Sequence, residues 1–161
     1  MAYLKILPVA SNMHLNNLIK YITRPDKTDE QVLVSSTACQ TKTAVRDFAT
    51  VRTMSGKQRG LVAHQLVRSF PLGEELAAKM LPGYQYIVCT HVDRDHIHTH
   101  IVFNSASYLT GEKYYGNKKS LWIMREESDR LCRKYGLSVI DPSARSGLDR
   151  RTLEAAQRGG S

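Results

Sequence analysis

Two β-rich runs at 84–92 and 96–104 constrain the fold of this chain more than any other feature of its sequence. They read YQYIVCTHV and HIHTHIVFN, and only the residues DRD separate them. Runs rich in β-branched and aromatic residues that are joined by so short a connection predict a β-hairpin. The chain should therefore contain an antiparallel sheet that includes this hairpin.

Four of the six histidines lie in the hairpin segment HVDRDHIHTH, at 91–100. Side chains alternate between the two faces of a strand, so His98 and His100 share one face. If the loop closes symmetrically around residues 94–95, His91 lies opposite His98 and Cys89 lies opposite His100. Three imidazoles then converge above the sheet. The other face, toward the core, should carry Ile97, Thr99, Ile101 and Phe103.

Three histidines around an open position suit a divalent metal ion with room for a substrate oxygen. Such a nitrogen-rich set favours manganese, zinc, nickel or copper over calcium. Asp93 and Asp95 are candidates to orient the rings, and His96, on the same face, is an alternative ligand. A polar, solvent-facing hairpin without a metal is the other interpretation, which four histidines in so short a segment disfavour.

Hydrophobic periodicity predicts the remaining elements. Strands are expected at 3–9 and 61–70, with short extended pieces at 31–36 and 137–142. Helices are expected after Ser11 or Asn12 and at 43–54, 73–81 and 120–136, the last capped by Ser120. The first carries an apolar stripe of Leu15, Leu18, Ile19 and Ile22 and should end before Pro25. This order predicts an α+β fold, a central antiparallel sheet flanked by helices.

Composition narrows the function classes. The formal net charge of +8 indicates a polyanionic partner, nucleic acid first. No apolar run approaches the roughly 18 residues of a membrane span, and no signal-peptide pattern opens the chain, so we expect no membrane insertion. The scattered Cys39, Cys89 and Cys132 are typical of reduced thiols in a cytoplasmic protein. We expect one domain over 1–140 and a basic, frayed tail over 141–161.

Tyr21 is a candidate nucleophile. It lies off the apolar stripe of its helix, in the segment KYITRPDK with Lys20, Arg24 and Lys27. Cations near a tyrosine favour its phenolate and bind phosphate. On spacing alone, a surface tyrosine at a helix end is the alternative, and His14 is the fallback nucleophile.

Lysines and tyrosines alternate in the segment YLTGEKYYGNKKS at 108–120. Aromatic rings that stack on bases, with lysines on phosphates, are typical of single-stranded nucleic-acid binding. The candidate DNA contacts are Arg24, Arg68, Lys113, Tyr114, Lys118 and Lys119, with Lys5 as a further backbone contact.

Three segments, in this order, resemble the motifs of conjugative relaxases of the P-type mobilisation family, which belong to the HUH endonuclease superfamily. NNLIKYITRPDKT resembles the motif that carries the nucleophilic tyrosine. LVAHQLVRSFPLGEE resembles the second motif, a strand before a helix. HVDRDHIHTHIVFN resembles the third, with His-x-Asp, then His-x-His, apolar residues and Asn. The resemblance covers most of residues 1–140.

The resemblance implies the HUH-endonuclease fold and a metal-dependent DNA relaxase. It implies site- and strand-specific nicking of single-stranded DNA at an origin-of-transfer hairpin, in plasmid or integrative-element conjugation. Tyr21 would attack the scissile phosphate and become linked to the DNA 5′ end, and His91, His98 and His100 would hold the metal. Manganese or magnesium is the expected ion, with zinc or nickel as substitutes. Accessory relaxosome proteins and a coupling protein are the expected partners.

The sequence departs from the family at two points. His96 stands where relatives often carry Asn, which keeps it open as a ligand. Family members usually have a long C-terminal region, so this chain is expected to be a piece of a longer protein.

Two other functions stay open at this point. HIHTHIV also resembles the histidine-triad nucleotide hydrolases, in which the middle histidine, here His98, is the nucleophile and no metal is used. A basic DNA-binding module with a structural metal is the non-enzymatic alternative.

Overall fold

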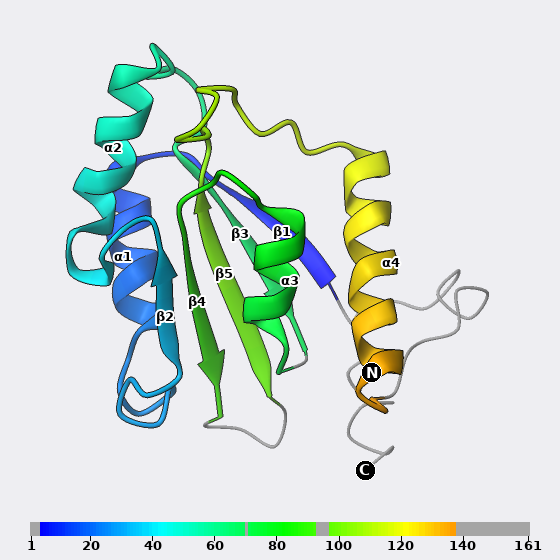
Figure 1. Cartoon of the computed structure of the whole chain (residues 1–161). Helices are drawn as coiled ribbons and strands as arrows, with labels where there is room; N and C mark the ends of the chain where they lie inside the picture. The colour runs from blue at the N-terminus through cyan, green and yellow to red at the C-terminus, as the bar shows by residue number, and fades with distance from the viewer. Residues whose placement is uncertain (1–3, 70, 93–96, 138–161) are drawn as a thin grey trace.

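A single five-stranded antiparallel sheet organises the chain (Figure 1). The structure is a computed structural model that describes residues 4–69, 71–92 and 97–137. The strands, in the spatial order β1-β3-β5-β4-β2, are β1 (Leu4–Val9), β2 (Val34–Thr37), β3 (Ala63–Arg68), β4 (Tyr86–His91) and β5 (His98–Asn104). The helices are α1 (Asn12–Ile22), α2 (Ala44–Met54), α3 (Gly73–Met80) and α4 (Lys118–Lys134), with a 3₁₀ turn at Thr41–Thr43. The predicted α+β fold is confirmed.

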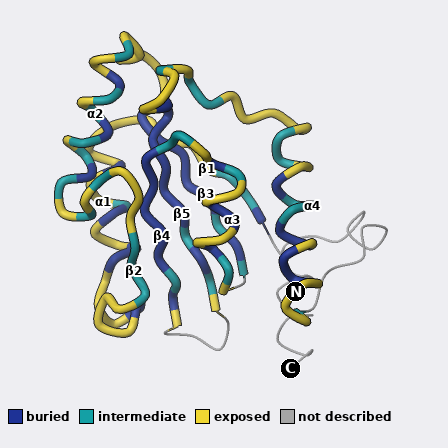
Figure 2. Tube along the Cα trace, viewed as in Figure 1, coloured by how far each residue is buried: buried dark blue, intermediate teal, exposed yellow. Residues whose placement is uncertain are grey.

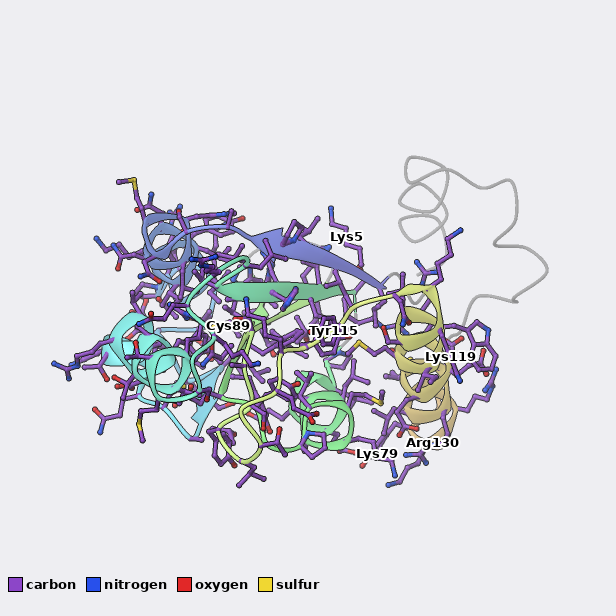
Figure 3. All side chains as sticks on the ribbon, turned by 90° about the horizontal axis from the view of Figure 1, so that it is seen from above. Lys5, Lys79, Cys89, Tyr115, Lys119 and Arg130 are labelled. Carbon is purple, nitrogen blue, oxygen red and sulfur yellow. The ribbon has the colours of Figure 1, made fainter. Side chains whose placement is uncertain are left out.

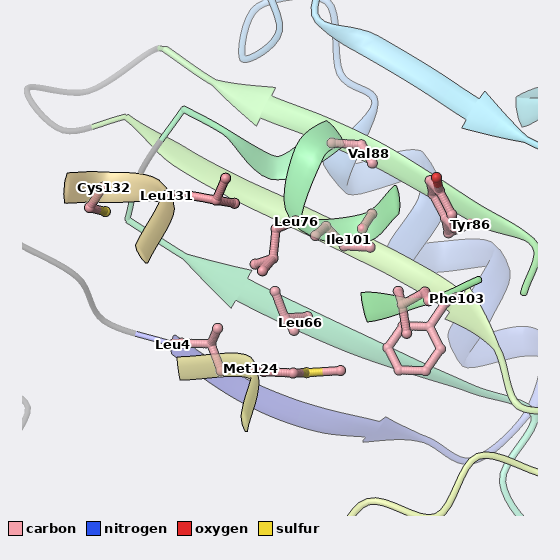
Figure 4. Close-up of a cluster of buried hydrophobic side chains, with 12 residues drawn as sticks. Leu4, Leu66, Leu76, Tyr86, Val88, Ile101, Phe103, Met124, Leu131 and Cys132 are labelled. Atoms are coloured by element: carbon pink, nitrogen blue, oxygen red, sulfur yellow. The ribbon is translucent and has the colours of Figure 1, made fainter. Parts of the chain in front are cut away.

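Helices cover both faces of the sheet, so the core has two layers. On one face, α1 and α2 pack on the sheet, and Leu15 and Phe48 belong to one buried cluster with Ile87. On the other face, Leu76 of α3 and Met124 of α4 belong to a second cluster (Figure 4). The three central strands are the most buried part of the molecule (Figure 2).

The helix α1 forms where its apolar stripe predicts it. Ser11 is the N-cap, and its side chain accepts a hydrogen bond from the backbone N–H of His14. The helix ends at Ile22, ahead of Pro25, because the residue before a proline disfavours the helical conformation.

The cap of α4 differs from the prediction. Asn117, not Ser120, is the N-cap, and the two residues form a capping box. The Asn117 side chain accepts from the Ser120 N–H, and the Ser120 hydroxyl accepts from the Asn117 N–H. The cap, and with it the start of the helix, therefore lies three residues before the predicted position.

The β4–β5 register is the one that the sequence predicted. His91 pairs with His98, and Cys89 pairs with His100. Thr99, Ile101 and Phe103 are buried, as expected. The expectation for Ile97 was wrong. This residue precedes the first residue of β5 and is 43% exposed, so the alternation of the strand does not reach it.

A buried arginine ties the two helices of the α1–α2 face to the sheet. The Arg52 guanidinium donates to the Val62 carbonyl at 3.1 Å and to Asn104 Oδ1 at 3.3 Å. It also donates to Asn12 Oδ1 at 2.9 Å. Asn104 in turn donates to the Phe48 carbonyl. The network joins the first turn of α1 to α2, to the residue before β3 and to β5, so it helps to set where α1 begins.

Three expectations concern the whole chain. Within the described ranges, no helix has the length and apolarity to cross a membrane. The three cysteines are free, which agrees with reduced thiols. The expected tail at 141–161 and the extended piece at 137–142 lie outside the described residues, apart from residue 137.

Arg68 is a core residue, which contradicts its expected role as a DNA contact. Its side chain is fully buried, and its Nη2 lies 3.5 Å from Asp129 Oδ1, which is also buried. The same nitrogen lies 3.6 Å from Cys132 Sγ. The arginine therefore links the end of β3 to α4 inside the protein, where a DNA phosphate cannot reach it.

We predict that Asp129→Asn lowers the free energy of unfolding by about 3 kcal/mol, because it removes the carboxylate from a buried arginine. Urea unfolding followed by circular dichroism measures the change. Glu127→Gln is the matched control on the same helix, because its partner Arg130 is exposed. Equal losses in the two variants would contradict a special role for the buried pair.

A histidine outside the hairpin also lies in the core. His64 of β3 stacks on Phe103, with ring centroids 5.2 Å apart, and meets the edge of Tyr114 at 5.2 Å. Burial, and next the charge of Lys113, lower the pKa of His64 from 6.5 to about 4. The folded protein thus keeps this imidazole neutral at pH values where the unfolded chain protonates it.

We predict that His64 makes the fold acid-sensitive. The unfolded chain takes up a proton near pH 6.5 and the folded protein only near pH 4, so stability falls between these values and levels off below them. The loss reaches up to about 3 kcal/mol. Urea unfolding at a series of pH values should show this slope in the native protein and a smaller one in His64→Leu. Parallel curves for the two proteins would rule out this assignment.

Candidate active site

Three aromatic rings from three elements meet at one end of the sheet. Tyr21 lies in the last turn of α1, and its ring centroid is 5.9 Å from that of His91 on β4 and 6.4 Å from that of His100 on β5. Both contacts are edge-to-face. The two imidazole centroids are 4.3 Å apart. The tyrosine is 43% exposed, so a substrate can reach it while its ring rests on the histidines.

A hydrogen bond to α1 orients His91. Its Nε2 lies 2.8 Å from the Ile22 carbonyl oxygen, and the residue is buried. A carbonyl only accepts, so Nε2 carries the hydrogen, and in the neutral ring Nδ1 is the nitrogen with a lone pair for a metal. Metal-binding histidines commonly donate their other N–H to a carbonyl in this way, which fixes the ring. The same bond also holds the end of α1, next to Tyr21, against β4.

The segment after α1 is fastened to the end of β4. The Val92 N–H donates to the Lys27 carbonyl at 2.8 Å, and the Thr90 N–H donates to the Leu33 carbonyl at 3.0 Å. Together with the hydrogen bond between His91 and Ile22, these two bonds connect the end of β4 to the segment that follows Tyr21. The polypeptide that follows Tyr21 is therefore held against the histidine-bearing strand.

Backbone strain follows in the same segment. Asp29, Glu30 and Gln31 have φ values of 52°, 54° and 68°, in the left-handed region that favours glycine. Each such residue costs on the order of 1–3 kcal/mol, and surrounding contacts must offset that cost. One contact is the Gln31 amide, which donates to the Thr23 carbonyl at 2.9 Å.

Of the three cations expected around Tyr21, one contacts its ring. The Lys27 ammonium lies 5.3 Å from the ring centroid, and the residue is only 8% exposed. Lys20 is exposed and lines a cavity of about 340 Å³ between α1 and α2. Arg24 is exposed and donates two hydrogen bonds, of 2.9 and 3.1 Å, to the Asp26 carboxylate.

The proposed metal ligands fit a divalent ion by chemistry and register. His91, His98 and His100 share a face of adjacent strands, and imidazole nitrogens suit manganese and its neighbours. Two of the rings are packed together, and His98 is half-buried at the first position of β5. Over the described residues, however, no three His, Cys, Asp or Glu side chains are arranged so that they could hold a metal. The alternative ligand His96 and the orienting candidates Asp93 and Asp95 lie outside the described residues.

Two of the candidate DNA contacts are occupied within the protein. The Lys113 ammonium donates to the Arg59 and Leu61 carbonyls, which fastens the loop before β3. Burial, with the charges of Arg52 and Lys57, lowers the pKa of Lys113. Tyr114 is half-buried and packs edge-on against Phe103 at 5.0 Å, so it extends the core.

Lys118 and Lys119 are exposed on the first turn of α4. This helix covers the face of the sheet opposite to α1, and Figure 3 shows Lys119 on it, across the sheet from α1 and α2. The start of α4 also lies toward the end of the sheet away from the last residues of β4 and the first residues of β5 (Figure 1). The structure therefore does not bring these lysines to Tyr21.

The arrangement places a phenol beside a histidine pair and a cation, groups that can serve attack on a phosphodiester. Sequence reasoning missed Arg52 and Asn104, which position α1. Nothing in the sequence paired Asn104 with an arginine 52 residues away.

Residues 21–137 match a relaxase family described as MobA/VirD2-like, nuclease domain. A protein named rlx from Staphylococcus aureus is 37% identical, over 75% of this chain and 41% of its own length. The group II intron-interrupted relaxase LtrB of Lactococcus lactis subsp. cremoris is 25% identical, over 81% of this chain and 32% of its own length. The chain thus spans less than half the length of these relatives.

Solved structures share the fold. The MobM relaxase domain, solved with oriT DNA and manganese, has a TM-score of 0.62 at 11% identity, and the alignment covers 98% of both chains. A second chain, described as "Molecular Basis of Vancomycin Resistance Transfer in Staphylococcus aureus", has a TM-score of 0.55 at 12% identity and covers 86% of this chain and 96% of that one. At such low identity these structures support the fold alone.

The family match spans more than half of the chain and includes both Tyr21 and the histidine hairpin. The match therefore favours the relaxase interpretation over the resemblance to histidine-triad nucleotide hydrolases. The chain belongs to the MobA/VirD2-like relaxase family, and it contains that family's nuclease domain.

Proposed function

We propose that this chain nicks single-stranded DNA at an origin of transfer and retains the 5′ end as a phosphotyrosine. The packing of the Tyr21 ring against His91 and His100 carries this proposal, because it brings the nucleophile to the histidine face. The family assignment and the folds of relaxases such as MobM support it. The expected setting is plasmid or integrative-element mobilisation.

A divalent ion, manganese or magnesium, completes the proposed site. His91, through Nδ1, and His98 and His100 would hold it. When bound, the ion withdraws charge from the non-bridging oxygens of the scissile phosphate. The hydrogen bond from His91 to Ile22 fixes the ring that would bind it. Manganese in the structure of the MobM relaxase domain supports the choice of metal class.

The proposed transfer forms one bond to phosphorus and breaks another, and the proton lost by the phenol is balanced by the proton gained by the leaving oxygen. The Tyr21 phenol loses its proton, and its oxygen forms a bond to the phosphorus. The bond between phosphorus and the 3′ oxygen breaks, and that oxygen leaves with a proton as a free 3′-OH. The product is a phosphodiester of the same charge, so the 3′-OH can attack it in the reverse direction to rejoin the strand. No water is consumed, which separates this transfer from hydrolysis.

The DNA contacts are proposed from exposure and charge. Arg24 lies three residues after Tyr21, and its pairing with Asp26 is a solvent-exposed contact that a phosphate can replace at small cost. Lys118 and Lys119, on the far face, are candidates for DNA flanking the nick. Relaxosome accessory proteins, a coupling protein and a cytoplasmic location are proposed from the family.

We predict that Tyr21→Phe abolishes the covalent adduct and leaves oligonucleotide affinity nearly unchanged, because only the phenolic oxygen is removed. The measurement uses single-stranded origin-of-transfer oligonucleotides with manganese, followed by a denaturing gel. Fluorescence anisotropy of a labelled oligonucleotide gives the affinity. An adduct that persists in Tyr21→Phe and disappears in His14→Ala would move the nucleophile to His14. Binding without an adduct in the native protein would favour a non-catalytic DNA-binding module.

We predict that chelation stops adduct formation and that manganese or magnesium restores it. His91→Ala, His98→Ala and His100→Ala should each weaken manganese binding by roughly 100-fold or more, because each removes a ligand. Electron paramagnetic resonance of unbound manganese measures binding without reference to activity. His14→Ala, on the exposed side of α1, is the control for metal affinity. Unchanged affinity in the three hairpin variants would contradict the assigned ligands.

A further inference from the structure

Lys27 differs from the other basic residues near Tyr21 in its burial and in its contact with the tyrosine ring. It follows the nucleophile by six positions, yet the turn after α1 brings its ammonium back to 5.3 Å from the centre of the tyrosine ring. The residue is 8% exposed, whereas lysines are rarely buried to this extent. Lys20 and Arg24 are exposed, so the three cations of this segment are not equivalent.

The backbone around Lys27 is held more firmly than its place in a loop suggests. Its carbonyl accepts the Val92 N–H at 2.8 Å, which joins it to the end of β4. The adjacent Thr28 is fully buried, and its hydroxyl donates to the Arg24 carbonyl at 2.8 Å. The left-handed residues Asp29 and Glu30 follow directly. A strained and tightly bonded turn thus fixes where the Lys27 side chain starts.

The Tyr21 ring, in contrast, has little else to restrain it. It lies at the C-terminal end of α1 and is 43% exposed, so two torsion angles would otherwise be free. His91 and His100 contact it edge-to-face on one side. The Lys27 ammonium contacts the ring through its π system, an attraction that strengthens as water is excluded. The ring contacts of Tyr21 thus come from two histidines and one cation.

We infer that Lys27 is a positioning residue for the nucleophile, holding the Tyr21 ring against the histidine pair so that its oxygen faces the scissile phosphate. This inference rests on the proposed function. Orientation of a nucleophile affects the rate of bond formation more than the affinity for DNA. The expected signature is therefore a change in rate at saturating DNA.

The experiment measures single-turnover adduct formation and oligonucleotide affinity in parallel. Lys27→Met and Lys27→Gln keep most of the side-chain length but remove the charge, and each should slow adduct formation by about 5- to 30-fold with little change in affinity. Lys27→Arg keeps a cation above the ring and should recover most of the rate. Lys79→Met, on an exposed position of α3, removes the same charge elsewhere and should match the native protein.

The other outcomes test the role of Lys27 and the proposed function separately. A native rate in Lys27→Met overturns the inference, and so does a loss confined to affinity, which would make Lys27 a phosphate contact. Thermal unfolding of each variant tests its fold, and if all three Lys27 substitutions unfold the protein, Lys27 is structural and the inference fails. If the native protein forms no adduct with any metal, the proposed function itself fails. An adduct in the native protein with an unaltered rate in the variants overturns only the role of Lys27.

Discussion

The hydrogen bond between His91 and the Ile22 carbonyl joins the two halves of the site. Its donor is on β4, in the sheet, and its acceptor is the residue after Tyr21, at the end of a helix. A bond of this kind in a buried place is worth on the order of 1 kcal/mol net, but leaving it unmade costs more. It therefore fixes the position of α1 relative to the strand as well as the orientation of the ring. Tyr21 and the histidines belong to separate elements, and this bond joins those elements directly beside Tyr21.

Both ends of α1 are fixed by polar contacts, although its middle is held by apolar packing. At its start, Asn12 accepts from the buried Arg52, and at its end Ile22 accepts from His91. Leu15 and Ile19 fill the cluster between these two points. Apolar packing is non-directional and tolerates a helix that slides or rotates slightly, whereas the two hydrogen bonds do not. The two hydrogen bonds therefore also fix the position of the Tyr21 backbone, which lies in the last turn of α1.

The hairpin was predictable because two simple rules apply to it. Alternation of side chains in a strand sets the face, and a symmetric short connection sets the register. Both hold here, so the pairs of His91 with His98 and Cys89 with His100 follow from the sequence. The helix α1 and the off-stripe position of Tyr21 follow in the same way from helical periodicity. Local patterns thus predict most of the fold and the faces on which the site residues lie.

Most features that the sequence did not predict depend on residues far apart in the chain or on the path of a turn. Charged residues are mostly exposed, so Arg68 was expected on the surface, but Asp129, 61 residues later, pairs with it in the core. The choice of Lys27 among three neighbouring cations depends on the path of a turn with three left-handed residues. None of those residues is a glycine, so no sequence signal marks the turn. The Asn117 cap was missed because Ser120, its partner in the capping box, is an equally good cap by type.

The positions of the basic residues limit which of them could contact DNA near Tyr21. The net charge of +8 suggested a DNA-binding surface, yet Arg68 is in the core, Lys113 is bonded to a loop, and Lys118 lies across the sheet from Tyr21. Exposed charges farther apart than the Debye length, about 8 Å at physiological salt, act on each other weakly. The exposed lysines of α4 lie on the face of the sheet opposite to α1, apart from the basic residues next to Tyr21. Around Tyr21 itself, the structure brings together His91, His100 and one cation, Lys27.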